Sequence, residues 1–361
     1  MAAVQLNTAT ENNSIHISNA ISNSNCSQEK QAFNMKSLAI VGPTFFGYGS
    51  AVSLTFRKLG YPAKFFNERQ NDTLIAKIIY RSGVLKRIFS FYLRRQRACL
   101  VSDILLSKPE AVIFISPEFV NGDEIHELKR HGCRVVCYMW DSFANKPAAL
   151  RFLDCFDSVA TFDPKDSEQY GLRLINLFAE DEFDCKNEGT IAGRSLELAY
   201  VGTNHSNRLS YLSLLKRFYN LTNRNIFVHA FHGNLIYYLR NIALYGRKAY
   251  EIGTWAKLSK AEIAGVFKAS KIVLDITHPD QEGLTSRTFE TLAANAILLT
   301  NNRNAPLLLP DFADQIVVYD YDCFEVALKS AFLKMGNCKS DVSREYLFIN
   351  RFVAELLEMA T

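Results

Sequence analysis

The sequence lacks long apolar runs and the marks of an export signal. No stretch approaches the roughly 18 consecutive apolar residues of a membrane-spanning helix. Residues 1–34 contain fourteen Asn, Ser or Thr residues, and they have neither the basic start nor the apolar core of a signal peptide. We therefore expect a cytoplasmic protein whose first 34 residues form a disordered tail.

The sequence also shows no bias toward glycine or proline, and its cysteines form no recognisable ligand set. Gly and Pro number 17 and 9 among 361 residues, and 48% of the chain is hydrophobic, which excludes collagen-like, low-complexity and wholly disordered chains. A chain of this length favours two domains, each with its own core. Cys133 and Cys137 suit alternation in a strand, because no second pair has a spacing that would complete a zinc site.

Acidic residues are missing from one stretch of the chain. No Asp or Glu occurs between Asp72 and Asp103, and the basic residues there are Lys77, Arg81, Lys86, Arg87, Arg94, Arg95 and Arg97. The formal net charge of the chain is +4, so these seven cations leave the rest at 4 − 7 = −3. This balance indicates a globular protein with a local basic patch and no nucleic-acid partner.

The basic stretch is also rich in apolar side chains. They are Ile78, Ile79, Leu85, Ile88, Phe89, Phe91, Tyr92 and Leu93. Cations interleaved with apolar residues are typical of a segment that lies on an anionic membrane surface, so residues 77–97 are predicted to dock to one. A solvated helix face is the alternative.

Strand-like and helix-like segments alternate twice along the chain. The first set of strands is expected at residues 37–41, 62–66, 111–115, 134–139 and 158–162. After a polar stretch at 184–190 the second set follows at 196–201, 225–230, 271–276, 296–300 and 315–319. The pattern predicts an α/β protein with two Rossmann-like parallel sheets facing a cleft. We place the two domains at 35–188 and 189–344, followed by an amphipathic helix at 345–361.

Ligands of such sheets bind beyond the carboxyl ends of the strands. In the first domain, Gly47 and Gly49 lie in a turn after the first strand and are predicted to let a substrate approach the backbone. The sequence of this turn does not match G-x-G-x-x-G, so it does not predict a dinucleotide-binding motif. Glu118 and Asp141 also follow strands and are expected to face the cleft.

The segment after the strand at 271–276 carries the most chemical information. The spacing of Phe289, Leu292, Ala293 and Ala296 predicts a helix that begins near residue 284 or 285. The N–H groups at its start, together with the cation of Arg287, suit a diphosphate. Glu290 follows about one and a half turns later, where a carboxylate can accept two ribose hydroxyls.

This segment resembles a known family. Glu282 and Glu290 form an E-x7-E pair at the strand–loop–helix position where GT-B glycosyltransferases have it. The run at 281–290 resembles more narrowly the bacterial glycosyltransferases of spore-coat and lipopolysaccharide biosynthesis. Further pieces similar to this branch lie at 138–142, 156–163 and 200–203, with Arg208 after the last. The resemblance covers roughly residues 35 to 345.

The resemblance implies a role for each residue of the donor site. Glu290 would hold the nucleotide ribose, Thr285 and Ser286 the diphosphate, and Glu282 would lie near the transferred sugar. Arg208 follows the first strand of the second domain, where the wider family places a diphosphate-binding cation, so the resemblance implies diphosphate binding by Arg208, and we expect Gly202 and Arg287 at the same site.

The expected reaction is sugar transfer from a nucleotide-diphosphate sugar to a lipid-linked or surface-polysaccharide acceptor, such as lipopolysaccharide, capsule or exopolysaccharide. No metal-ligand cluster is apparent in the sequence, so we expect cations and the helix dipole to stabilise the leaving diphosphate, with no metal or organic cofactor. E-x7-E families more often retain the anomeric configuration, which we expect here; an inverting route would need Asp141 or Glu118 as a base. A nucleotide-sugar epimerase and a non-catalytic sugar-binding protein of envelope or coat assembly are the alternatives.

Overall fold

The computed structural model describes residues 37–44, 47–69, 83–185, 190–204, 208–222, 225–233, 235–246, 252–278, 281–334 and 342–361. The predicted tail at 1–34 lies outside these residues. Residues Lys36–Thr361 form one compact unit.

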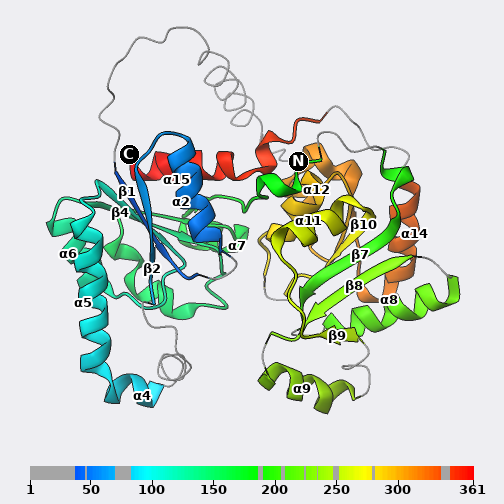
Figure 1. The fold of residues 1–361 in the computed structure, drawn as a ribbon, viewed down its shortest axis with the longest axis horizontal. Coiled ribbons are helices and arrows are strands. Elements are labelled where there is room, and N and C mark those ends of the chain that lie inside the picture. Colours follow the sequence, from blue (N-terminus) through cyan, green and yellow to red (C-terminus); the bar gives the residue numbers. More distant parts are fainter. Residues whose placement is uncertain are drawn as a thin grey trace, which may run out of the picture. The chain divides into compact units, whose positions relative to one another are not determined.

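The first sheet contains six parallel strands in the order β2-β1-β3-β4-β5-β6. The strands are β1 (Leu38–Gly42), β2 (Ala63–Asn67), β3 (Ala111–Ile115), β4 (Arg134–Met139), β5 (Ser158–Thr161) and β6 (Arg173–Leu174). The accompanying helices are α2 (Tyr48–Lys58), α4 (Gly83–Ile88), α5 (Ser90–Leu106), α6 (Gly122–Arg130) and α7 (Pro164–Tyr170). We call this sheet with its helices the first lobe (Figure 1).

The second sheet also has six parallel strands, in the order β12-β11-β10-β7-β8-β9. The strands are β7 (Leu196–Thr203), β8 (Ile226–Phe231), β9 (Gly253–Thr254), β10 (Ser270–Asp275), β11 (Ile297–Thr300) and β12 (Ile316–Val318). Its helices are α8 (Arg208–Thr222), α9 (Leu235–Tyr245), α11 (Lys260–Lys268), α12 (Ser286–Ala293), α13 (Ala305–Leu308) and α14 (Phe324–Lys334). We call this sheet with its helices the second lobe.

The structure confirms two Rossmann-like lobes and all ten predicted strands, with ends that differ by at most two residues. Of the strands in the described residues, only β6 and β9 were not predicted. Each of them has two residues and lies at one edge of its sheet. Two residues are too few to produce an alternation of apolar and polar side chains that could be recognised in the sequence.

The expectation that each domain has its own core holds only in part. Among the described residues, three apolar clusters belong to one lobe each, but a fourth is continuous across both and contains Ile40 as well as Leu298. The rings of Phe183 and Phe267 lie 5.8 Å apart within it. The chain between the sheets therefore helps to bury apolar surface of both lobes.

The final helix, α15 (Ile349–Ala360), follows the second lobe in sequence but packs on the first. The Phe352 ring lies 4.9 Å from that of Tyr138 and 4.6 Å from that of Phe178. Arg134 Nε also donates a hydrogen bond to the carbonyl of Met359 at 2.8 Å. Figure 1 shows α15 beside α2. The amphipathic face that the sequence predicted is therefore covered by the first lobe.

The basic stretch forms α4 and α5, while Lys77 and Arg81 lie outside the described residues. Arg97 points inward, because its Nε lies 2.8 Å from Glu124 Oε1 and its guanidinium lies over the Phe119 ring. Leu93 is buried against the same ring, so part of the predicted surface is core. Within the described residues, no helix is long and apolar enough to cross a membrane.

Candidate active site

The predicted donor residues gather at the carboxyl ends of β7 and β10. These strands are neighbours in the second sheet although β8 and β9 lie between them in sequence, and the strand order reverses between them. Such a switch point is where open α/β sheets bind their ligands. The loop that follows β10 leads into α12, as the sequence predicted.

The start of α12 is fixed by hydrogen bonds to the carboxylate of Asp275, the last residue of β10. Thr285, the residue before α12, donates its hydroxyl hydrogen bond to Asp275 Oδ2 at 3.0 Å. The hydroxyls of Thr277 and Thr300 reach the same oxygen at 3.5 and 3.4 Å. The Thr285 side chain thus fixes the helix start, and its backbone N–H is the group suited to an anion.

Three polar side chains beside this helix start have unsatisfied atoms, and of these Tyr200 and Asp275 are buried and Arg287 is half-buried. In the described part of the chain, Tyr200 Oη, Arg287 Nε and Asp275 Oδ1 have no hydrogen-bond partner. The Arg287 guanidinium lies 6.0 Å from the centre of the Tyr200 ring, and its Nη1 lies 3.8 Å from Asp275 Oδ1. Because buried polar atoms are nearly always paired, this group has the character of a ligand site.

Gly202 lies in β7 directly beneath these groups. A Cβ atom at this position would lie 2.6 Å from Tyr200 Oη and 3.4 Å from Arg287 Nη1. Any larger residue would therefore displace the phenol or the guanidinium. Arg208 begins α8 nearby and donates from Nη1 to the carbonyl of Thr203 at 2.9 Å.

Glu290 is a buried carboxyl on α12. Burial raises its pKa to about 7, even though the cations of Arg287 and Lys260 act to lower it. Tyr48 of the first lobe donates its hydroxyl to Glu290 Oε1 at 3.4 Å, and the Ser286 side chain is hydrogen-bonded to the same phenol. The two lobes therefore meet at the residue predicted to bind ribose.

Lys260 and Glu180 complete the surroundings of this carboxyl. The Lys260 ammonium forms an ion pair with Glu180 and lies 4.8 Å from the centre of the Tyr48 ring. Burial raises the pKa of Glu180 against the effect of this cation. Neither residue could be predicted from the sequence, because the two reach this carboxyl only through the packing of α11.

The loop before α12 is tied to the first lobe by Asp163. Its Oδ2 accepts the backbone N–H groups of Glu282 and Gly283, each at 3.0 Å, while its Oδ1 accepts those of Lys165 and Asp166 at the start of α7. A Cβ at Gly283 would lie 2.6 Å from the Phe162 ring. One buried carboxylate therefore joins α7 of the first lobe to the loop that precedes α12.

Glu282 presents its side chain to solvent above this fixed backbone. Asn302 Nδ2 donates to its carbonyl at 3.1 Å, which holds the loop from the second lobe as well. Among the described residues, its carboxylate has no hydrogen-bond or ion-pair partner, and its charge acts to raise the pKa of Asp166. Glu282 and Glu290 thus belong to one rigid loop–helix unit but differ fully in burial.

The two glycines predicted to let a substrate approach the first lobe differ in their surroundings. Gly47 has a φ of 72° and precedes α2, so glycine there serves the turn. Gly49 is buried, and a Cβ atom there would collide with the Phe65 ring. Packing therefore accounts for Gly49, whereas Gly47 remains on the exposed side of the loop.

Glu118 and Asp141 have contrasting environments. Glu118 forms ion pairs with both Arg69 and Lys146. Asp141 is half-buried after Trp140 and has no ion-pair or hydrogen-bond partner among the described residues, and burial raises its pKa. Of the two, Asp141 has the environment that favours the protonated form of a carboxyl.

Some residues of the site were not predicted, namely Tyr48, Asp163, Tyr200, Lys260 and Asp275. Tyr200 and Asp163 lie in the segments that carry the family resemblance, and Tyr48 lies in the glycine-containing turn, so a weak signal existed for these three. Asp275 lies one residue before the end of the strand predicted at 271–276, and a carboxylate at the end of a strand is itself a sequence signal for a site.

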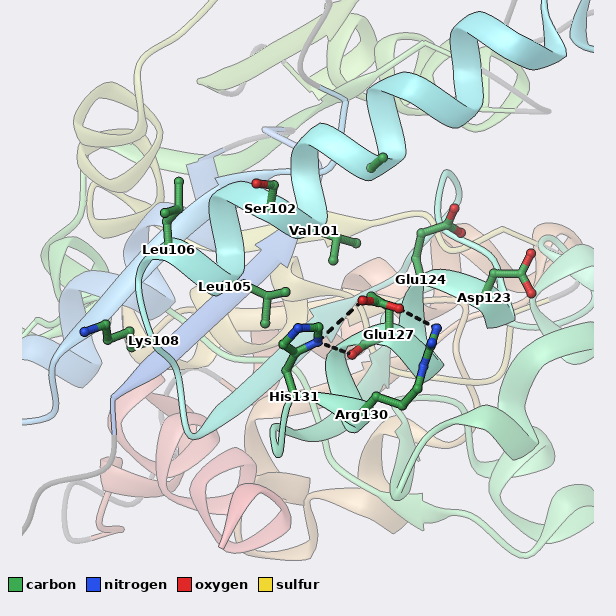
Figure 2. A pocket seen from close by; sticks show the side chains of 11 residues that line it. Val101, Ser102, Leu105, Leu106, Lys108, Asp123, Glu124, Glu127, Arg130 and His131 are labelled. Carbon is green, nitrogen blue, oxygen red and sulfur yellow. Dashed lines mark hydrogen bonds and ion pairs between the residues drawn. The ribbon is translucent and has the colours of Figure 1, made fainter.

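A separate hollow of about 650 Å³ lies between α5 and α6 (Figure 2). Figure 2 shows Arg130 and His131 both turned toward Glu127, with His131 Nδ1 3.5 Å from Glu127 Oε1. None of the predicted site residues lines this hollow. It is a groove between two surface helices and takes no part in the site.

Comparison with known proteins supports this arrangement. Residues 224–334 match a family model described as glycosyl transferase-like, and this stretch includes α12 and both glutamates. No curated protein matches the chain.

Solved structures of low sequence identity share the fold. The UDP-GlcNAc 2-epimerase from Methanocaldococcus jannaschii has a TM-score of 0.55 at 11% identity, over 90% of this chain and 99% of that one. The E. coli trehalose-6-phosphate structure with bound UDP-2-fluoro glucose has a TM-score of 0.53 at 12% identity, over 90% and 96%. The S. aureus MnaA-UDP structure has a TM-score of 0.56 at 10% identity, over 90% and 95%. The chain therefore has the GT-B fold, with a glycosyltransferase-like segment that contains α12 and both glutamates of the candidate site.

Proposed function

We propose that this protein is a glycosyltransferase that takes a sugar from a nucleotide-diphosphate sugar. One observation carries the proposal, namely the group of buried, unsatisfied polar atoms beside the start of α12, at the switch point of the second sheet. A cation, a phenol and a helix N-terminus converge there, and these are the groups that bind a diphosphate. The glycosyltransferase-like family match at 224–334 supports the same assignment.

In this proposal each donor residue has a distinct task. Glu290 accepts ribose hydroxyls, and the backbone N–H groups of Thr285 and Ser286 bind the diphosphate. Arg287, supported by the packing space at Gly202, supplies positive charge to the same group. Arg208 adds a second cation from the start of α8. Glu282, which is exposed beside them, contacts hydroxyls of the transferred sugar.

The chemistry requires stabilisation of the departing diphosphate, on which negative charge grows in the transition state. Arg287 and the N-terminus of α12 provide that stabilisation, and we assign the enzyme no metal. We propose retention of the anomeric configuration. If the reaction instead inverts, Asp141 is the base, because its half-buried carboxyl has no ion-pair partner in the described part of the chain that would hold its charge.

The acceptor is proposed to be lipid-linked or part of a surface polysaccharide. The support is the surface of α4 and α5, where Ile88 and Phe91 are 67% and 80% exposed. Arg87, Arg94 and Arg95 are exposed on the same two helices. Apolar side chains among cations suit an anionic bilayer, which would bring the first lobe to a membrane-borne acceptor.

A nucleotide-sugar epimerase is the second candidate, because UDP-GlcNAc 2-epimerases are among the structures that share the fold. The two reactions differ in their products. A transferase releases free nucleoside diphosphate only in proportion to glycosylated acceptor, whereas an epimerase changes the sugar of the nucleotide-sugar without any acceptor. Chromatography of a panel of nucleotide-sugars after incubation separates them.

Nucleotide binding is tested by thermal melting with UDP, GDP and ADP. At least one of them should raise the melting temperature of the wild-type protein, and Glu290→Gln should reduce this rise, because an amide cannot accept two ribose hydroxyls as well as a carboxylate does from the same position. Glu355→Gln is the matched control, since Glu355 is a carboxyl on α15 whose pKa is likewise raised by burial. If the wild type responds to none of the three nucleotides, the proposed function is wrong.

A further inference from the structure

Tyr48 is the point at which the first lobe touches the two α12 residues assigned to the nucleotide. It begins α2, directly after the turn at Gly47. Its hydroxyl donates to Glu290 Oε1 at 3.4 Å and is hydrogen-bonded to the Ser286 side chain. A single phenol thus contacts both the proposed ribose residue and the proposed diphosphate residue.

The ring of Tyr48 is held in place from several sides. Edge contacts join it to Trp140, with 6.1 Å between ring centres, and to Phe178, with 5.7 Å. The ammonium of Lys260 lies 4.8 Å from its centre. The hydroxyl is therefore aimed at α12 by packing that belongs to both lobes.

The Glu290 carboxylate has limited room for partners. In the described part of the chain, the Tyr48 hydroxyl is its only hydrogen-bond partner. Burial keeps the pKa of Tyr48 above its usual value, so this phenol retains its proton and donates it. A ribose hydroxyl is also a neutral donor, and it needs the same carboxylate oxygens.

We infer that Tyr48 competes with the ribose for Glu290, so that nucleotide binding displaces the phenol and releases this contact between the lobes. The inference rests on the proposed function, because it requires a nucleotide at Glu290. It makes Tyr48 a residue that lowers nucleotide affinity while it joins the first lobe to α12.

Titration calorimetry with UDP, or with whichever of GDP and ADP stabilises the wild type, tests the competition. Tyr48→Phe keeps the ring and removes the competing donor, so it should bind the nucleotide about three- to tenfold more tightly than the wild type. Tyr138→Phe is the matched control. It also loses a tyrosine hydrogen bond in the first lobe, to the carbonyl of Ile175 at 3.0 Å, and should bind the nucleotide as the wild type does.

The fluorescence of Trp140 provides a second measurement. The chain has two tryptophans, so Trp255→Phe leaves Trp140 alone to report on its contact with Tyr48. Saturating nucleotide should change Trp140 emission, and the change should be smaller when Tyr48→Phe is added. A structural role of the phenol alone would not couple this emission to nucleotide binding.

Each outcome decides one question. Equal or weaker nucleotide binding by Tyr48→Phe overturns the competition. If that variant does not fold, unchanged Trp140 emission at saturating nucleotide in the Trp255→Phe protein overturns it instead. Absence of any nucleotide response in the wild type contradicts the proposed function and not the competition alone.

Discussion

At the scale of single residues, the site depends on polar groups that burial makes costly. Glu290 is buried with a pKa raised to about 7, and Arg287, whose charge acts on it, has an unsatisfied atom, as does Tyr200 beside Arg287. Such groups are retained where a ligand supplies the missing partners. The protonation of Glu290 therefore determines how nucleotide binding should respond to pH.

Nucleotide affinity should fall as the pH drops from about 8 to about 6. The Glu290 carboxyl has a raised pKa of about 7, so it is charged above this pH and protonated below it. The protonated form accepts hydroxyl hydrogen bonds poorly, and the loss should approach tenfold per pH unit at the acidic end. Calorimetry at pH 8, 7 and 6 measures it.

The Glu290→Gln protein is the control for that titration. It shares every other titrating group, including those of the nucleotide, so its residual affinity should vary less between pH 6 and pH 8. Equal pH profiles for the two proteins would show that Glu290 does not bind the ribose.

At the scale of elements, the loop that precedes α12 is set by contacts from both lobes. Asp163 accepts two of its N–H groups, and Asn302 donates to the carbonyls of Glu282 and Gly283. The close approach of Gly283 to Phe162 leaves no space for a side chain. The position of the α12 N-terminus is therefore a consequence of packing between elements.

Gly283→Ala should destabilise the protein by about 1–3 kcal/mol, because the new Cβ atom would force Phe162 away from the loop. Urea unfolding gives the free energy. Gly265→Ala is the control, since that glycine lies in α11 with nothing within 4 Å of its Cβ position and alanine favours a helix. Equal stability of Gly283→Ala and the wild type would contradict the role of this close contact.

At the scale of the whole molecule, charge and apolar surface are distributed unevenly. The basic stretch forms α4 and α5 in the first lobe, but Arg97 is paired with Glu124, so it adds little to an external field. The cations that remain exposed on these helices include Arg94 and Arg95, near the apolar side chains of Ile88 and Phe91.

Vesicle flotation tests whether the surface of α4 and α5 binds a lipid bilayer. The wild type should float with vesicles that contain anionic phospholipid and much less with neutral ones, because each exposed cation contributes roughly 1 kcal/mol at an anionic surface. Ala at Arg94 and Arg95 should weaken flotation, and so should Phe91→Ser. Ala at Arg351 is the control, since that cation pairs with Glu355 on α15. Flotation unaffected by the first three changes would exclude docking through α4 and α5.

The sequence by itself determined the strands, the order of the two lobes and the start of α12, because apolar periodicity and glycine positions act over a few neighbouring residues. The E-x7-E pair could be found for the same reason, since both glutamates belong to one loop and helix. The tertiary structure alone decided that Tyr48 and Lys260 reach Glu290, that Asp163 holds the loop at 282–283, and that α15 returns to the first lobe. These contacts join residues that are far apart in the chain. They form only when two sheets pack together, and no local pattern in the sequence encodes that packing.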